Sequence, residues 1–268
     1  MTNGGDDIIK SGGGNDVVFA GRGNDVAYGE AGDDFIRGGS SGVLGEQSYL
    51  GSQFDGGLGN DTIRAGANDT VLGGAGDDRL DGGDGGRSAA LLGGDGNDTI
   101  NAGYFGANTI DGGAGDDVIG SNYHLGLGDT ITGGTGNDSI SSNNNGDHLM
   151  LGEEGDDVLY AGYGQSTLDG GVGDDALISG YLGAQMTGGD DSDVFALHTL
   201  NADAPLLSPT NGIDTIADFA ADEDHLIVTY SAAHPAPLPA EMSFRTVDAS
   251  DPNAPATELV RLRPDGQE

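Results

Sequence analysis

Alternating apolar and polar residues recur in short stretches along most of the chain. In each stretch one apolar residue lies two positions after an Asp, and a second lies two positions before a Gly-Gly pair. Alternation with a period of two predicts half-buried strands, so each repeat supplies two short strands joined by glycine-rich turns. The first apolar row is Ile63, Leu80, Ile100, Ile119, Ile140, Leu159, Leu177 and Phe195, and the second row is Phe54, Val71, Leu91, Ile110, Ile131, Met150, Leu168 and Met186.

The turn sequence GGTGND at Gly133 has close counterparts from Gly56 to Gly188, at steps of 17 to 21 residues. Nearer the N-terminus the period is nine, and Asp7, Asp16, Asp25 and Asp34 close successive units. A unit this short cannot bury its own apolar face, whereas stacked units can. The pattern predicts an all-β fold, a parallel β-roll of two sheets that rises about 4.8 Å per coil. We assign the roll to residues 1–193.

After Asp193 the repeat stops, and the segments DVFAL, GIDTIADF and EDHLIVTY are typical of strands. Two further strands are expected near residues 241–247 and 257–263. The last coil of a parallel roll exposes an unpaired edge that needs a cover. Residues 194–268 are therefore predicted to form a C-terminal capping β segment.

The net charge of the chain limits the kinds of molecule that it can bind. The chain of 268 residues has 45 Asp and Glu against 9 Lys and Arg, a net charge of -36, and 53 glycines. Such a chain stays expanded unless a cation neutralises its carboxylates. Nucleic acid and anionic membranes are poor partners for it. No apolar run approaches the roughly 18 residues of a membrane span, and the absence of cysteine excludes disulfides and thiolate metal sites.

The Gly-Gly-x-Gly-x-Asp turn has the composition of a calcium loop. Glycines let backbone carbonyls converge on one point, and the Asp carboxylate completes an all-oxygen cage that suits Ca²⁺. Over roughly residues 3–195 the units resemble the RTX (repeat-in-toxin) nonapeptide G-G-x-G-x-D-x-U-x. That resemblance implies that each ion lies between the loops of successive coils, held by backbone carbonyls and by the sixth-position Asp. The implied ligands are Asp7, Asp16, Asp25, Asp34, Asp61, Asp78, Asp98, Asp117, Asp138, Asp157, Asp175 and Asp193.

The loops are expected mainly along one edge of the roll. Asp7 and Asp25 lie on the edge opposite Asp16 and Asp34, but after Phe35 the turns of that opposite edge lose the motif. Only Asp69, Asn108 and Asp129 are expected to keep an oxygen at the matching position, so replacing Asp129 should change little. The segment Gly38–Phe54 is interpreted as an enlarged loop of the same edge.

A second set of residues follows the first apolar row by four positions: Tyr104, Tyr123, Asn144, Tyr163 and Tyr181. One interpretation is a stack that closes the turns. The other is an exposed stripe that binds a polysaccharide or a cell surface, since regularly spaced tyrosines can stack on sugar rings. The sequence leaves both open. Ice binding is disfavoured because the third loop position is irregular, varying from Gly13 to Leu58 to Thr135.

No catalytic pattern is present, and we expect that the chain is not an enzyme. It has no His-Glu-x-x-His, no nucleophile elbow and no phosphate-loop lysine. Its five histidines show no metal-ligand spacing. Paired carboxylates such as Asp116-Asp117 recur in coil after coil, which favours a structural role over acid–base catalysis.

The C-terminal residues Asp193–Phe195, Asp214–Phe219 and Asp224–Leu226 resemble the closing segments of serralysin-type proteases and alginate epimerase R-modules. Together the resemblances imply an extracellular module that folds on Ca²⁺ and belongs to a protein exported by type I secretion machinery. Extracellular modules bind Ca²⁺ at roughly 10⁻⁴–10⁻³ M. Residues 1–7 have no features of a secretory signal peptide. The end Arg263–Glu268 lacks an apolar-rich secretion tail, which favours an excised fragment.

Overall fold

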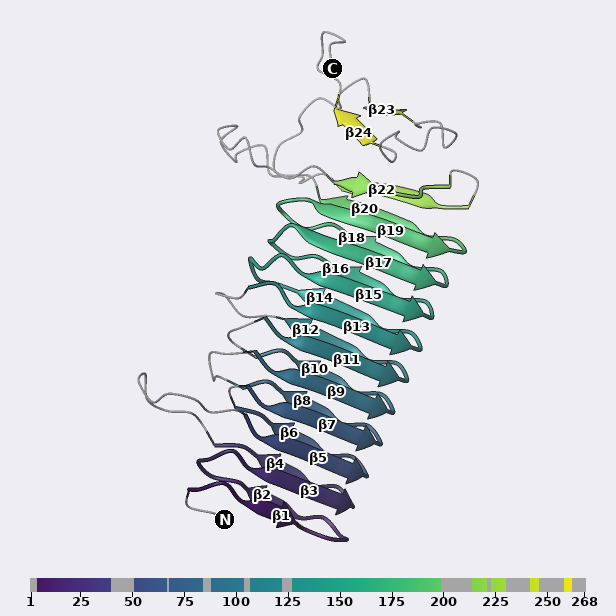
Figure 1. The fold of residues 1–268 in the computed structure, drawn as a ribbon. Helices are drawn as coiled ribbons and strands as arrows, with labels where there is room; N and C mark the ends of the chain where they lie inside the picture. Colours follow the sequence, from purple (N-terminus) through teal and green to yellow (C-terminus); the bar gives the residue numbers. More distant parts are fainter. Residues whose placement is uncertain are drawn as a thin grey trace.

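The computed structural model describes residues 4–39, 51–66, 68–83, 88–103, 107–121, 127–198, 214–220, 223–229, 242–245 and 258–261. These residues form a parallel β-roll in which the chain alternates between two sheets (Figure 1). The first sheet contains β1 (Ile8–Lys10), β3 (Val26–Ala31), β5 (Gln53–Leu58), β7 (Thr70–Ala75), β9 (Ala90–Asp95), β11 (Thr109–Ala114), β13 (Thr130–Thr135), β15 (Leu149–Glu154), β17 (Ser166–Val172), β19 (Ala184–Asp190) and β21 (Thr215–Ile216).

The second sheet contains the even-numbered strands β2 (Val17–Phe19), β4 (Phe35–Arg37), β6 (Thr62–Arg64), β8 (Arg79–Asp81), β10 (Thr99–Asn101), β12 (Val118–Ser121), β14 (Ser139–Ser142), β16 (Val158–Tyr160), β18 (Ala176–Ile178), β20 (Val194–His198) and β22 (His225–Thr229). Every pairing among these strands is parallel and in register, as in Ile110 with Ile131. The predicted fold class is thereby confirmed.

The core is the narrow space between the two sheets. All sixteen residues of the two predicted apolar rows are buried, each at most 2% exposed. Each row has one side chain per coil, so an Ile, Leu, Val, Met or Phe always packs on its counterpart in the next coil. The register is fixed by this alternation, because a shift of one residue would turn every apolar side chain outward.

Parallel pairing continues beyond residue 193. β20 pairs with β18, and β22 pairs with β20, so the chain forms one further coil before the topology changes. The antiparallel strands β24 (Glu258–Arg261) and β23 (Met242–Arg245) then follow β21 at the end of the first sheet. The division of the chain at residue 193 stays a prediction. Within the described residues no helix could span a membrane.

Two edges connect the sheets. Turns that lead from an odd-numbered to the next even-numbered strand form the Asp edge, where Asp16, Asp34 and the later motif carboxylates lie. Turns that lead back form the opposite edge, which includes Asp7 and Asp25 as predicted. Most of the loop predicted at Gly38–Phe54 lies outside the described residues, as do Tyr104 and Tyr123.

Candidate metal centre

The turns of the Asp edge depend on glycine at defined positions. In GGTGND, Gly134 has φ 123° and Gly136 has φ 121°, values that side chains rarely adopt. A Cβ at Gly134 would also overlap the carbonyl oxygen of Gly113 in the preceding coil. Glu30 (φ 73°) and Glu153 (φ 81°) occupy the position of Gly134 in two other coils. Glycine therefore permits both the turn and the close stacking of successive loops.

One oxygen of each motif carboxylate continues the hydrogen-bond ladder along the Asp edge. The N–H of Asp117 donates to Asp138 Oδ1 (2.8 Å), and the N–H of Asp138 donates to Asp157 Oδ1 (2.7 Å). The same bond joins every pair of neighbours from Asp16 to Asp193. It aligns all ten predicted ligands of this edge in one row and holds each carboxylate in a fixed orientation.

The other oxygen of these carboxylates has no hydrogen-bond donor. The buried Oδ2 atoms that lack one belong to Asp16, Asp25, Asp34, Asp61, Asp78, Asp98, Asp117, Asp138, Asp157 and Asp175. Ten of the twelve predicted ligands are in this set, all except Asp7 and Asp193. An unpaired buried carboxylate oxygen is strongly destabilising. Its recurrence in coil after coil indicates that something other than a protein donor meets it.

The Oδ2 atoms point at backbone carbonyls. A Cβ built on Gly133 would overlap Asp138 Oδ2 and would lie 2.9 Å from the carbonyl oxygen of Gly152 in the next coil. Two oxygens with no hydrogen between them thus face the same small space, which glycine leaves open. The arrangement recurs at Gly29, Gly56, Gly73, Gly93, Gly112, Gly152 and Gly170. Carboxylate and carbonyl oxygens from adjacent coils are the donor set of a hard cation such as Ca²⁺, so the residues fit such an ion.

The protonation behaviour of the row shows how unfavourable these carboxylates are without a cation. Burial, followed by the charges of Asp157, Asp117 and Asp116, raises the pKa of Asp138 to about 7 against the opposing bond from the Asp117 N–H. Burial likewise raises the pKa to about 7 in Asp78 and Asp175, and to about 6 in Asp61, Asp98, Asp117, Asp157 and Asp193. A bound dication would favour the charged form.

A second ladder runs along the exposed side of the same edge. The N–H of Asn137 donates to Asp116 Oδ1 (2.8 Å), and the N–H of Asp156 donates to Asn137 Oδ1 (2.9 Å). Asn and Asp alternate strictly through Asn15, Asp33, Asn60, Asp77, Asn97, Asp116, Asn137 and Asp156. Up to Asp156, alternation keeps the exposed carboxylates two coils apart, roughly 10 Å, and so limits like-charge repulsion. Asp174 then follows Asp156 in the next coil and ends the alternation.

The opposite edge satisfies most of its carboxylates internally. Asp69 Oδ2 accepts the N–H of Gly66 (2.5 Å), and Asp129 Oδ2 accepts the hydroxyl of Ser121 (2.6 Å). Only Asp25, among the described residues of this edge, has a buried Oδ2 without a donor. This distribution agrees with ion loops mainly along one edge, with Asp25 as the exception near the N-terminus.

One sequence-based expectation for the opposite edge was wrong. Ser52 and Ser166 also place an oxygen at the matching position: Ser52 Oγ accepts the N–H of Asp25 (3.1 Å), and Ser166 Oγ accepts the N–H of His148 (3.2 Å). A hydroxyl serves because the ladder needs only an acceptor. The effect of replacing Asp129 stays a prediction: because Asn108 and Ser121 both donate to it, we expect a loss of stability rather than a loss of calcium.

The C-terminal segment supplies acceptors that sequence reasoning did not assign. Asp224 Oδ1 accepts the N–H of Asp193 (3.0 Å) and continues the Asp-edge ladder, while its Oδ2 accepts the N–H of Ala220 (2.7 Å). Asp214 Oδ1 accepts the N–H of Ala184 (2.8 Å) and continues the opposite edge. Both aspartates lie two residues before an inward apolar residue, a spacing that could have identified them.

Of the predicted Tyr set, the described pair forms a stack. The rings of Tyr163 and Tyr181 are parallel within 6°, with centroids 4.5 Å apart. Asn144, in the same set, is buried and hydrogen-bonded instead. The stack agrees with the turn-closing interpretation, but it covers only one face of each ring and both tyrosines stay exposed, so a binding stripe remains open.

No group of three or more His, Cys, Asp or Glu side chains surrounds one point in the part of the chain that the structure describes. The candidate sites are instead repeated loops in which carbonyls accompany single carboxylates. The model of the RTX calcium-binding nonapeptide repeat matches residues 1–27, 11–41, 55–86, 92–121, 126–153 and 151–180, more than half of the chain. No curated protein matches the sequence of the chain. The matched repeats and the loop geometry agree, and the chain belongs to the family of RTX calcium-binding repeat proteins.

Proposed function

We propose that the chain is a calcium-dependent folding module of an exported protein, which becomes ordered when it reaches Ca²⁺ outside the cell. The observation that carries this proposal is the set of ten buried Oδ2 atoms without hydrogen-bond donors, eight of which share a small space with a carbonyl of the next coil. The proposed ligands are these carboxylates together with the carbonyls of the first glycines. Asp7 and Asp193 complete the proposed set at the two ends.

The metal-free roll has a large electrostatic cost at neutral pH. A shift of the pKa from 3.8 to about 6, as in Asp117, corresponds to about 3 kcal/mol once the group is charged. Eight such aspartates give a cost on the order of 20 kcal/mol, more than the net stability of most domains. Ions that occupy the loops offset it, so the free energy of binding becomes free energy of folding.

This coupling suits export. In the calcium-poor cytosol the chain would remain unfolded and could pass through a narrow secretion channel. Outside the cell, Ca²⁺ reaches the 10⁻⁴–10⁻³ M range in which extracellular modules bind. The role of type I secretion machinery rests on membership of the RTX family and on this physical coupling. We infer no catalytic activity for the chain itself.

A calcium titration followed by far-UV circular dichroism tests the proposal. We expect a largely unfolded chain in chelator at neutral pH and a cooperative gain of β signal as Ca²⁺ reaches the millimolar range. Mg²⁺ at equal concentration should not substitute, because it requires smaller octahedral sites and releases its water reluctantly. A chain that is fully folded in chelator at neutral pH would contradict the proposal.

A further inference from the structure

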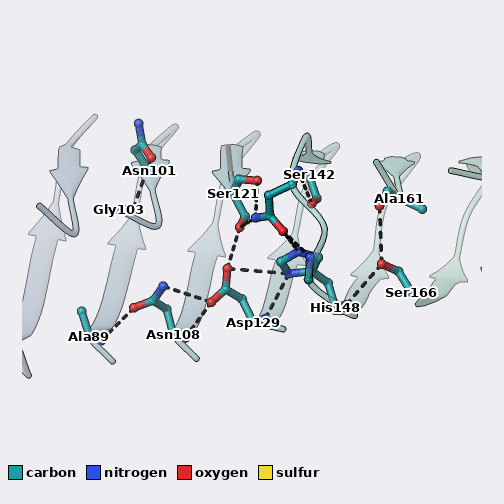
Figure 2. Close-up of polar contacts among 12 residues, drawn as sticks. Ala89, Asn101, Gly103, Asn108, Ser121, Asp129, Ser142, His148, Ala161 and Ser166 are labelled. Carbon is teal, nitrogen blue, oxygen red and sulfur yellow. Dashed lines mark hydrogen bonds and ion pairs between the residues drawn. The ribbon is translucent and has the colours of Figure 1, made fainter. Parts of the chain in front are cut away.

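A buried polar network occupies the opposite edge in the middle of the roll (Figure 2). It joins Ser121, Asp129, Asn144 and His148, each at most 4% exposed. Asn144 Nδ2 donates to Ser121 Oγ (2.9 Å), and the Ser121 hydroxyl donates to Asp129 Oδ2 (2.6 Å). The network is distinct from the ion loops, because all its carboxylate oxygens have protein donors.

His148 takes the ladder position that Asp129 holds in the preceding coil and Ser166 in the following coil. Its Nδ1 accepts the N–H of Asp129 (3.0 Å). Its Nε2 lies 2.8 Å from Asn144 Oδ1, whose own amide nitrogen donates to Ser121. An acceptor at Nδ1 and a donor at Nε2 require a neutral imidazole with its proton on Nε2.

The surroundings contain little that would stabilise a charged ring. Asp129 Oδ2 is 3.6 Å from Nδ1, beyond hydrogen-bond distance, and is already bonded to Ser121. Asp147 is the other carboxylate that acts on the ring, and it is exposed and accepts the N–H of Gln165. The following coil contributes Ser166, and the second sheet contributes Ser121 and Ser142, none of which titrates. Burial lowers the pKa of His148, and Asp129 and Asp147 only partly oppose that effect.

We propose that the His148 network is a proton-sensitive joint, which holds the middle coils together while the imidazole is neutral and opens when it is protonated. A proton on Nδ1 would point at the N–H of Asp129, so two donors would face each other and the ladder bond would be lost. The coil of Asp129 would then separate from the coil of His148 on this edge. The roll thus responds to protons at a site where it does not depend on calcium.

The expected direction follows from the two states. The unfolded chain binds a proton at His148 near the ordinary pKa of 6.5, whereas burial lowers this pKa in the folded chain. Folding is therefore unaffected well above pH 6.5 and weakens as the pH falls below it. In the limit where only the unfolded chain binds this proton, the folding constant falls about tenfold between pH 7.5 and 5.5.

The variant His148→Asn tests this on the full chain in saturating Ca²⁺. Asn108 shows that an Asn at this ladder position accepts the N–H of the preceding coil, from Ala89 at 2.8 Å, without a titrating group. Denaturant unfolding at pH 7.5 and 5.5 gives the folding constants of both proteins. We expect the wild-type constant to fall about tenfold more than that of the variant. Equal pH dependence of the two proteins would overturn the proposal.

Nuclear magnetic resonance of the wild type gives an independent test, which also serves if the variant does not fold. The ¹⁵N shifts of His148 in the calcium-loaded protein should show the proton on Nε2 and a titration midpoint below 6.5. A proton on Nδ1 of the neutral ring, or a titration midpoint at or above 6.5, would overturn the proposal.

Discussion

Acid should fold the metal-free chain. The buried carboxylates of the Asp edge have a pKa of about 6 to 7 in the roll, as in Asp117 and Asp138, but about 3.8 in the unfolded chain. A group whose pKa is raised by folding contributes stability that is fully present below the unfolded pKa and is lost as the pH rises through the folded pKa. In calcium-free buffer we therefore expect β structure to appear as the pH is lowered from 8 to 5.

The magnitude follows from the same shifts. Between pH 8 and 5, a group with a folded pKa of about 6 gains about 1.4 kcal/mol of folding free energy, and one with a folded pKa of about 7 gains about 2.6 kcal/mol. Five aspartates of the first kind and three of the second give a sum on the order of 15 kcal/mol when treated as independent. His148 opposes this by about 2 kcal/mol at most, so the aspartates decide the sign.

Far-UV circular dichroism against pH, in buffer freed of calcium by a chelating resin, measures the effect. The same scan in saturating Ca²⁺ should show the reverse trend, because a bound dication holds the carboxylate pKa low and protons then compete with it. Acidification should thus fold the metal-free chain and weaken the loaded one. A metal-free chain as unfolded at pH 5 as at pH 8 would refute the reasoning, as would the same direction of change in both scans.

A pair of charge-neutralising variants localises the effect. Asp138→Asn removes one buried carboxylate and should reduce the acid-induced gain of the metal-free chain by about 2.6 kcal/mol. Asp147→Asn removes one exposed carboxylate of the opposite edge and keeps the bond from the Gln165 N–H. It should leave the gain unchanged. Equal effects of the two variants would show that net charge, rather than the buried row, drives folding.

Four further substitutions test other parts of the structure. Calorimetry should show that Asp138→Ala lowers the number of Ca²⁺ ions bound, whereas Asp129→Ala leaves that number unchanged. Asp129→Ala should instead lower the unfolding free energy by about 2–4 kcal/mol, because Asn108 and Ser121 lose their acceptor. Glu153→Gly should raise the calcium-loaded unfolding free energy by about 1 kcal/mol, because it relieves a φ of 81°; an unchanged melting temperature would contradict this. Asn137→Asp completes a row of four exposed carboxylates in successive coils, with Asp116, Asp156 and Asp174, and should destabilise the roll by about 1–2 kcal/mol at low salt. This effect should disappear in denaturation curves at high salt.

The repeat made most of the architecture predictable from the sequence. Each unit must bury its apolar residues against its neighbours, so the spacing from Ile131 to Ile140 already implies two inward rows on either side of a turn. The structure confirms both rows in full. The motif carboxylates could also be predicted as one row, because a periodic sequence places equivalent residues at equivalent points of each coil.

The opposite edge could not be read in the same way. Its turns differ in length and composition from coil to coil, so no period indicates which side chains meet. Asn144 and Ser121 are 23 residues apart in the sequence, yet the Asn144 side-chain amide donates a hydrogen bond to the Ser121 hydroxyl. Asp214 and Asp224, which continue the two ladders, follow a break in the period.

The sequence by itself determined the parallel roll, its two apolar rows and the all-oxygen chemistry of the Asp edge, because each depends on residues that recur at a fixed offset. Only the tertiary structure decided which carboxylate oxygens remain without a donor. Whether Asp129 Oδ2 needs a cation depends on Ser121, which lies at the other end of the same opposite-edge turn, while Asp138 Oδ2 shares its space with the carbonyl of Gly152 instead. The distinction is physical: a buried carboxylate with protein donors on both oxygens is satisfied, and one that faces another oxygen is not.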